Sequence, residues 1–190
     1  GVPDQPLLTG EILPKNCGTA GLVVVGSHTQ KSTAQLQALL TLPAAEGIPF
    51  RSELVLQGEG SFSEEISRAR KACEDAMKRG KTAVVYTGRT LLVREDDTQE
   101  SALLRSVRIS DGLQTIVREL TVAPVFLIAK GGITSSDVAV EALGARRGFV
   151  LGQIKPAGEP ERKVSFPVYP MSFFPEMWEK KILFAKLWSC

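Results

Sequence analysis

Two short stretches carry glycine and hydroxyl side chains directly after an apolar run, Gly26–Thr29 and Gly131–Thr134. Glycine adopts backbone angles that are closed to other residues and lets another atom approach the main chain. Hydroxyl groups and the free N–H groups at the start of a following helix donate hydrogen bonds to an anion, which the helix dipole also attracts. These features predict an anion site, such as one for a nucleotide phosphate, where Lys31 could neutralise charge.

Each stretch also has a simpler interpretation. A glycine turn before a helix is ordinary loop chemistry, and hydroxyls there usually cap the helix. His28, the single histidine, is more typical of a surface side chain than of a catalyst, and Lys130 is more simply an exposed amine. Glu95–Asp97 favours a solvated loop over a metal site. Neither glycine stretch matches the fingerprints of a dinucleotide fold or of a P-loop, which disfavours both.

The elements around the two stretches are predicted to bring them together. Leu22–Val25 and Val125–Ala129 are apolar without alternation, which is typical of strands buried on both faces. Helical spacing follows over about 31–40 and from Thr134 onward. Because ligands bind at the carboxyl ends of parallel strands, we expect both stretches to face one crevice.

The rest of the chain continues the alternation of strands and helices. Further strands are predicted at Glu53–Gln57, Thr82–Tyr86 and 148–154. A helix is expected to begin at Ser63 as its N-cap and to end at Gly80. Alternating strands and helices predict an α/β fold, a three-layer αβα arrangement with a mostly parallel sheet.

A long amphipathic helix is predicted over 100–120, with a possible break near Asp111–Gly112. Its apolar residues recur at helical spacing, which predicts one buried face. The expected inward residues are Leu103, Leu104, Val107, Leu113, Ile116, Val117 and Leu120.

Composition limits the class of protein. The 190 residues, 43% of them hydrophobic, suffice for one sizeable core. A net charge of +2 suggests neither nucleic acid nor an anionic membrane as a partner. The apolar runs are too short for a transmembrane helix. Three scattered cysteines show neither a disulfide framework nor zinc spacing, which fits a reducing, cytoplasmic location.

Together, "GLVVVGSHTQKSTAQL" and "FLIAKGGITSSDVAVEALGARR" resemble the C-terminal nucleotide-binding domain of the four-carbon acid sugar kinase family, from about Gly21 to about Lys155. The chain also resembles the kinase-like part of large multidomain plant proteins. The resemblance implies transfer of the γ-phosphate of ATP to a small sugar acid such as threonate, erythronate or 3-oxo-tetronate. Mg²⁺ is then expected to bind mainly through phosphate oxygens and water.

The resemblance also implies which residues bind the cofactor. The serine of the family's first motif, which contacts ATP, corresponds to Ser27, and the residues lining the phosphates correspond to Gly131, Gly132, Ile133 and Thr134. Many members have glutamate where this chain has Ile133. No residue of the sequence is assigned as the catalytic base or as a metal ligand.

Two departures from the family affect the expected domains. Residues 1–20 are predicted to be a linker or edge segment, 21–160 the nucleotide-binding domain, and 161–190 an aberrant tail. The tail has Phe174–Pro175 followed by Glu176 where the family has a final glycine loop. A single-nucleotide frameshift would account for this difference. The family's N-terminal substrate domain is missing, so we expect the chain to be a fragment that binds nucleotide at best.

Two other functions can be considered for the same sequence. A nucleotide-binding or docking module of a multidomain protein needs no turnover, and only activity with the partner domain separates it from a kinase. An NAD-dependent oxidoreductase is disfavoured because the chain lacks the glycine fingerprint and an acidic residue placed for the ribose.

Overall fold

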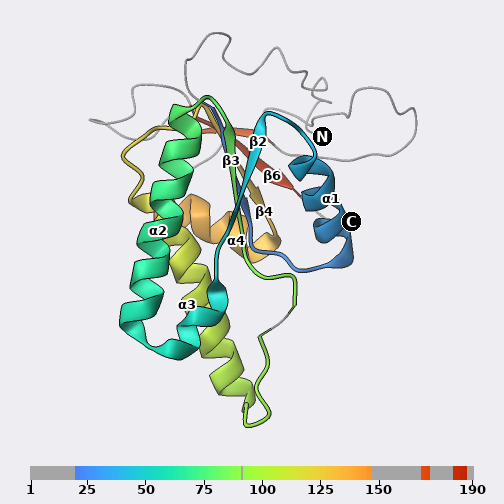
Figure 1. Cartoon of the computed structure of the whole chain (residues 1–190), viewed down its shortest axis with the longest axis vertical. Coiled ribbons are helices and arrows are strands. Elements are labelled where there is room, and N and C mark those ends of the chain that lie inside the picture. Colours follow the sequence, from blue (N-terminus) through green and yellow to red (C-terminus); the bar gives the residue numbers. More distant parts are fainter. Residues whose placement is uncertain (1–19, 91, 147–167, 172–181, 188–190) are drawn as a thin grey trace.

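The computed structural model describes residues 20–90, 92–146, 168–171 and 182–187 (Figure 1). The strands are Leu22–Val25 (β1), Ala45–Pro49 (β2), Thr82–Tyr86 (β3), Phe126–Lys130 (β4), Val168–Met171 (β5) and Ile182–Leu187 (β6). The α-helices are Gln30–Leu40 (α1), Glu59–Lys78 (α2), Gln99–Arg118 (α3) and Gly132–Asp137 (α4). A 3₁₀-helix spans Ser52–Gln57 (η2), and a π-helix, Val138–Ala142 (η3), continues α4.

The described strands form one sheet in the order β2-β3-β1-β4-β6-β5. All neighbouring pairs are parallel except β5 with β6. In the centre of the sheet, Val24 is opposite Val85 of β3 and Ala129 of β4. The predicted α/β fold with a mostly parallel sheet is confirmed.

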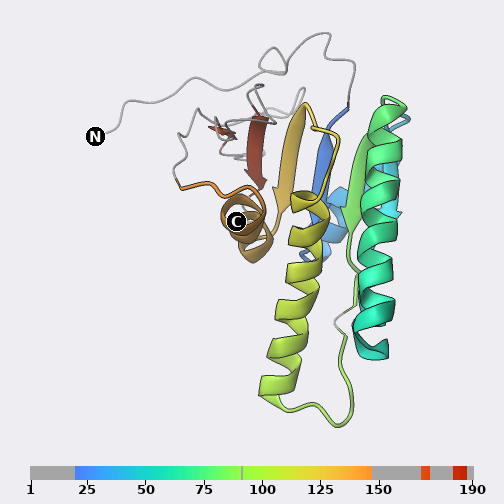
Figure 2. The same cartoon turned by 90° about the vertical axis from the view of Figure 1, so that its left-hand side faces the viewer.

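The helices cover both faces of the sheet, and connection handedness explains which helix lies where. Figures 1 and 2 show α2 and α3 side by side on one face, while α1 lies on the other. The chain moves along the sheet in one direction from β1 to β2, and then in the opposite direction from β2 through β3 to β4. Because such crossovers are right-handed, α1 must lie opposite to α2 and α3. Two buried clusters result, a large one beneath α2 and α3 and a smaller one beneath α1.

The strand predicted at Glu53–Gln57 is wrong. This segment is the 3₁₀-helix η2, and the strand that pairs with β3 is β2, immediately before it. Pro49 in β2 has no N–H for a sheet hydrogen bond, but β2 is an edge strand, where proline is tolerated. Helix α2 also begins at Glu59, four residues before the predicted N-cap Ser63.

Helix α3 is continuous through Asp111–Gly112, so the predicted break is absent. A Cβ atom at Gly112 would lie 2.9 Å from the rings of Phe50 and Phe62. This glycine therefore lets the aromatic side chains approach the helix, and the packing outweighs the weak helix propensity of glycine.

The expected inward face of α3 is only partly correct. Leu113, Ile116, Val117 and Leu120 are buried, whereas Leu103, Leu104 and Val107 are exposed, Leu103 by 64%. The helix has 20 residues and is about 30 Å long, whereas a five-residue strand spans about 17 Å. Its first half therefore extends beyond the sheet (Figure 2), where the sheet offers no surface to cover these side chains.

The C-terminal part of the chain departs from the strands that the sequence predicts. The strand expected at 148–154 lies outside the described residues. Strands β5 and β6 belong to 161–190, where the sequence predicted no strand.

Cys73 is a buried free thiol, and burial raises its pKa to about 12. In the described part of the chain, no helix is both long and apolar enough to cross a membrane.

Candidate functional site

The two glycine stretches lie next to each other at the carboxyl ends of β1 and β4. These strands are neighbours, with Val25 opposite Lys130, and the Gly26 N–H donates to the Lys130 carbonyl at 3.3 Å. A Cβ atom at Gly26 would lie 2.2 Å from Thr134 Oγ1, so only glycine fits between the two loops with this Thr134 conformation. The predicted meeting of the two stretches at one sheet edge is confirmed.

Gly131 has the backbone conformation that its position requires. Its φ of 118° lies in the region that residues with a Cβ rarely adopt, and a Cβ would lie 3.2 Å from the Ser27 Cβ. Its carbonyl accepts the Ser135 N–H at 2.9 Å, which starts α4. The amides of residues 132–134 therefore have no acceptor within the helix.

Hydroxyl groups form a cluster at the start of α1. Thr29 is the N-cap and accepts the Ser32 N–H at 3.3 Å, as the helix-cap interpretation predicts. The Thr29 hydroxyl donates to Ser32 Oγ at 2.9 Å, and the Ser32 hydroxyl donates to Ser27 Oγ at 3.0 Å. Ser27 Oγ also lies 3.5 Å from Thr29 Oγ1, where either hydroxyl could be the donor, so the three hydroxyl groups form one cluster.

A cavity of about 180 Å³ opens beside this edge, between the loops and the part of α3 from Ala102 to Leu113. Gly26, His28, Ile133 and Thr134 line it, together with polar and apolar residues of α3. Of the predicted cofactor residues, Ile133 and Thr134 line the cavity, whereas Ser27, Gly131 and Gly132 do not. The volume is below the range of about 300–1,000 Å³ typical of ligand pockets, so only part of a nucleotide fits.

A third loop at the same edge was missed by the sequence analysis. Thr87–Thr90 follows β3, the other neighbour of β1, and its Thr87, Gly88 and Thr90 line the cavity. The signal that could have revealed it is the sequence "TGRT" after an apolar strand, which repeats the combination of glycine and hydroxyls.

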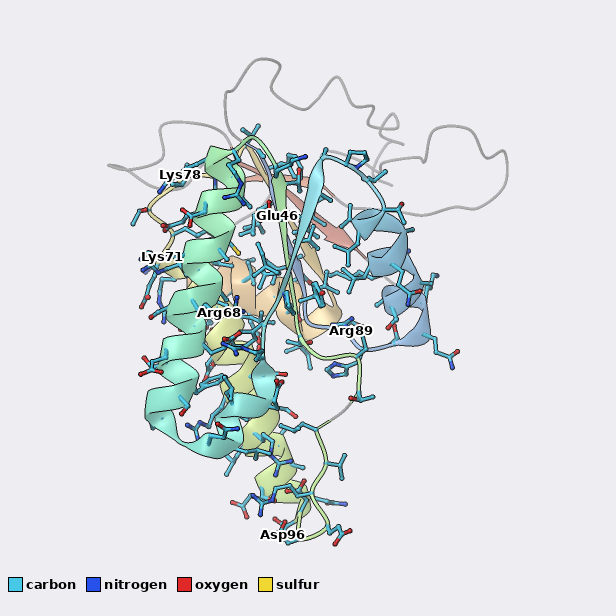
Figure 3. All side chains as sticks on the ribbon, in the orientation of Figure 1. Glu46, Arg68, Lys71, Lys78, Arg89 and Asp96 are labelled. Carbon is cyan, nitrogen blue, oxygen red and sulfur yellow. The ribbon has the colours of Figure 1, made fainter. Side chains whose placement is uncertain are left out.

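Arg89 ties this third loop to the first (Figure 3). Its guanidinium donates to the carbonyl oxygens of Ser27 at 2.7 Å and Thr87 at 2.6 Å. Burial lowers the pKa of Arg89, while nearby Tyr86, whose ring lies 5.9 Å away, opposes that effect. Arg89 therefore fixes the backbone of two site loops at once.

Replacing Arg89 by methionine should destabilise the protein by about 1–3 kcal/mol, because buried carbonyl groups lose a charged donor. Urea denaturation measures the change. Arg118→Met is the matched control, since exposed Arg118 bonds to Thr115 of its own helix, and it should change stability by less than about 0.5 kcal/mol. Equal stability of the two variants would contradict a loop-fixing role for Arg89.

Lys130 and Asp97 differ from their predicted environments. Lys130 is buried rather than exposed, because the α1 side of the sheet encloses it. Glu95 and Asp96 are exposed, as the solvated-loop interpretation predicts, whereas the Asp97 side chain is only 9% exposed. Arg105 at the cavity wall binds both carboxylate oxygens of Asp97, Nη1 donating to Oδ2 at 2.6 Å. This pairing lowers the pKa of Asp97. His28 is exposed, as predicted, although it lines the cavity.

Two solved structures share the fold. One is a protein from Salmonella typhimurium LT2 provisionally named a tRNA synthase, with a TM-score of 0.60 and 16% identity, covering 89% of this chain and 37% of that one. The other is a domain of unknown function (DUF1537) from Bordetella bronchiseptica, a domain-swapped dimer with bound citrate. Its TM-score is 0.53, with 16% identity, and the match covers 88% of this chain and 37% of that one.

The chain thus spans 37% of the length of each of these two solved structures. At 16% identity, these likenesses establish the fold alone. No curated protein matches the sequence. The model of the family described as the nucleotide-binding C-terminal domain matches residues 22–166, which include all three loops at the carboxyl ends of β1, β3 and β4. The chain therefore belongs to the nucleotide-binding C-terminal domain family.

Proposed function

We propose that this chain is the ATP-binding part of a kinase that phosphorylates four-carbon acid sugars of the threonate, erythronate or 3-oxo-tetronate type. Membership of the family gives a nucleotide-binding role. The sequence resemblance to four-carbon acid sugar kinases supports the more specific assignment. The acid and the reaction are part of the proposal.

The observation that carries the proposal is the placement of the loops at a topological switch point. The connection after β1 leaves toward one face of the sheet, while those after its neighbours β3 and β4 leave toward the other. Ligands of parallel α/β sheets bind in the crevice that such a divergence opens. The Ser27 hydroxyl and the first amides of α4, which have no acceptor within that helix, lie at this edge of the sheet.

These groups fit the chemistry of phosphoryl transfer. The reaction needs positioning and stabilisation of charge more than covalent participation by the protein. Among the described residues, no group of three or more His, Cys, Asp or Glu side chains could hold a metal ion. We expect Mg²⁺ accompanying ATP to be bound mainly through phosphate oxygens and water. It would neutralise phosphate charge.

The isolated chain should bind MgATP only weakly, with a Kd above about 100 μM, or about −5.5 kcal/mol. The cavity holds only part of a nucleotide, and the predicted tail replaces the family's glycine loop. Equilibrium dialysis with labelled ATP measures the affinity, and a Kd of a few micromolar would contradict this expectation.

Sequencing the nucleotides that encode residues 161–190 tests the frameshift hypothesis, because a single insertion must restore the glycine loop.

Activity tests the kinase assignment. The chain alone should not consume ATP with threonate, erythronate or 3-oxo-tetronate, because the acid site and the base are expected in the missing substrate domain. ATP consumption should appear when that domain is supplied in the same polypeptide. Failure with all three acids, in a folded protein that binds ATP, would count against the kinase.

A non-catalytic nucleotide-binding or docking module is the second candidate. Ile133 favours it, because this aliphatic side chain is 76% exposed beside the cavity, where many similar kinases have glutamate. ATP binding without turnover in the complete protein would select this alternative.

A further inference from the structure

Lys130 is a buried lysine to which the candidate functional site assigns no role. The residue is 3% exposed, and its amine has no hydrogen bond or ion pair with any part of the chain that the structure describes. Removing an ammonium group from water without a partner costs several kcal/mol. Burial, with a further contribution from the charge of Lys31, lowers the pKa of Lys130. Folding therefore maintains a costly arrangement at the carboxyl end of β4.

The side chain of Lys130 lies on the α1 side of the sheet. Alternate residues of a strand point to the same face, and Phe126 and Ile128 pack in the cluster beneath α1. Lys130 continues this series at the end of β4. Lys130 is opposite Val25 of β1, and the chain continues from Val25 through the Ser27 loop directly into the first turn of α1.

The first turn of α1 attracts anions. Gln30 begins an 11-residue helix, and the amide of this first residue has no acceptor within the helix. The first turn contains no acidic residue that would neutralise the dipole. The Ser27 hydroxyl lies beside this turn, 3.0 Å from the Ser32 hydroxyl, which donates to it.

We infer that Lys130, Ser27 and the first turn of α1 form a binding site for a phosphate group of the nucleotide polyphosphate, with Lys130 supplying its buried positive charge. This inference rests on the proposed nucleotide binding and extends it to the α1 side of the sheet, opposite the cavity. A lysine binds phosphate as a point charge and makes a charge-assisted hydrogen bond. The bound phosphate would supply the counter-charge of Lys130.

A purely structural role predicts different behaviour. A structural lysine contributes its packing, so its replacement should change stability and leave polyphosphate binding intact. A ligand-binding lysine is unfavourable in the empty protein, because its charge is desolvated. Lys130→Met should therefore leave the melting temperature unchanged or raise it, while it weakens polyphosphate binding.

The test compares the whole 190-residue chain with Lys130→Met, Lys130→Gln and Lys78→Met. Lys78 is an exposed lysine in the last turn of α2 (Figure 3), so its variant has the same loss of charge. Equilibrium dialysis gives the Kd for MgATP and for sodium tripolyphosphate, and circular dichroism gives the melting temperature. Both Lys130 variants should bind both ligands at least tenfold more weakly, whereas Lys78→Met should bind as the unchanged protein does.

The possible results separate the inference from the proposed function. Folded Lys130 variants that bind both ligands normally would overturn the inference and leave nucleotide binding in place. Unfolding of both variants would also overturn it, because Lys130 would then be structural. Binding of tripolyphosphate that depends on Lys130, without any binding of ATP, would support the phosphate site and refute the proposed function. If the unchanged protein binds neither ligand, both are refuted.

Discussion

Replacing Gly131 by alanine should destabilise the protein by about 1–3 kcal/mol and weaken MgATP binding at least tenfold. The new Cβ would have to tolerate a φ of 118° and would lie 3.2 Å from the Ser27 Cβ. Relief of that strain would separate the Ser27 loop from the loop after β4, and the two could no longer contact the same ligand. Urea denaturation and equilibrium dialysis measure the two effects.

Gly132→Ala is the matched control for this prediction. Gly132 is the first residue of α4, has no positive φ, and a Cβ there would meet no atom within 4 Å. Alanine favours the helix over glycine, so stability should be unchanged or rise by up to about 1 kcal/mol. Equal losses of stability in the two variants would refute a special requirement at Gly131.

Replacing Glu65 by glutamine should destabilise the protein by about 3 kcal/mol, because it removes the carboxylate from a buried ion cluster. The Glu65 side chain is fully buried, and it accepts from the backbone N–H of Arg51 at 2.8 Å. Arg51 Nε donates at 2.9 Å and Arg68 Nε at 2.7 Å. Through these contacts α2 holds the segment between β2 and η2. Urea denaturation at neutral pH measures the loss.

The contribution of Glu65 should also depend on pH. Burial alone would raise its pKa, but hydrogen bonds from Arg68 and Arg51 outweigh burial and lower the pKa from 4.5 to about 2. A lowered folded-state pKa stabilises the protein fully above the unfolded value, near 4.5, and this stabilisation is lost as the pH falls toward 2. The difference between the unchanged protein and Glu65→Gln should therefore decrease between pH 4.5 and 2.

A surface ion pair provides the comparison for Glu65. Glu59 pairs with Arg108, but its side chain is exposed, so Glu59→Gln should cost less than about 1 kcal/mol. Urea denaturation of both variants at pH 7, 4.5 and 3 separates the two cases. A Glu65→Gln variant as stable as Glu59→Gln at pH 7 would refute the importance of the buried cluster, and a pH-independent difference would refute the pKa explanation.

The sequence alone determined the fold class and the meeting of the two glycine loops. Leu22–Val25 and Thr82–Tyr86 were placed correctly, because continuous apolar runs of this length are stable only as buried strands between helices. Parallel strands then bring the residues after them to one edge. The contact between the Ser27 loop and the Gly131 loop followed from this rule, since β1 and β4 are neighbours.

Tertiary structure decided which side chains are covered and paired. Nothing local distinguishes Leu103, which extends beyond the sheet, from Leu113, which lies against it. Asp97 belongs to a charged run, and only the approach of Arg105 makes it an anchored carboxylate. Lys130 was predicted to be an exposed amine, yet it is the last residue of β4, and its side chain lies buried on the face of the sheet that α1 covers. Local pattern fixes an element and its periodicity, whereas the desolvation of a charge depends on surfaces that distant parts of the chain supply.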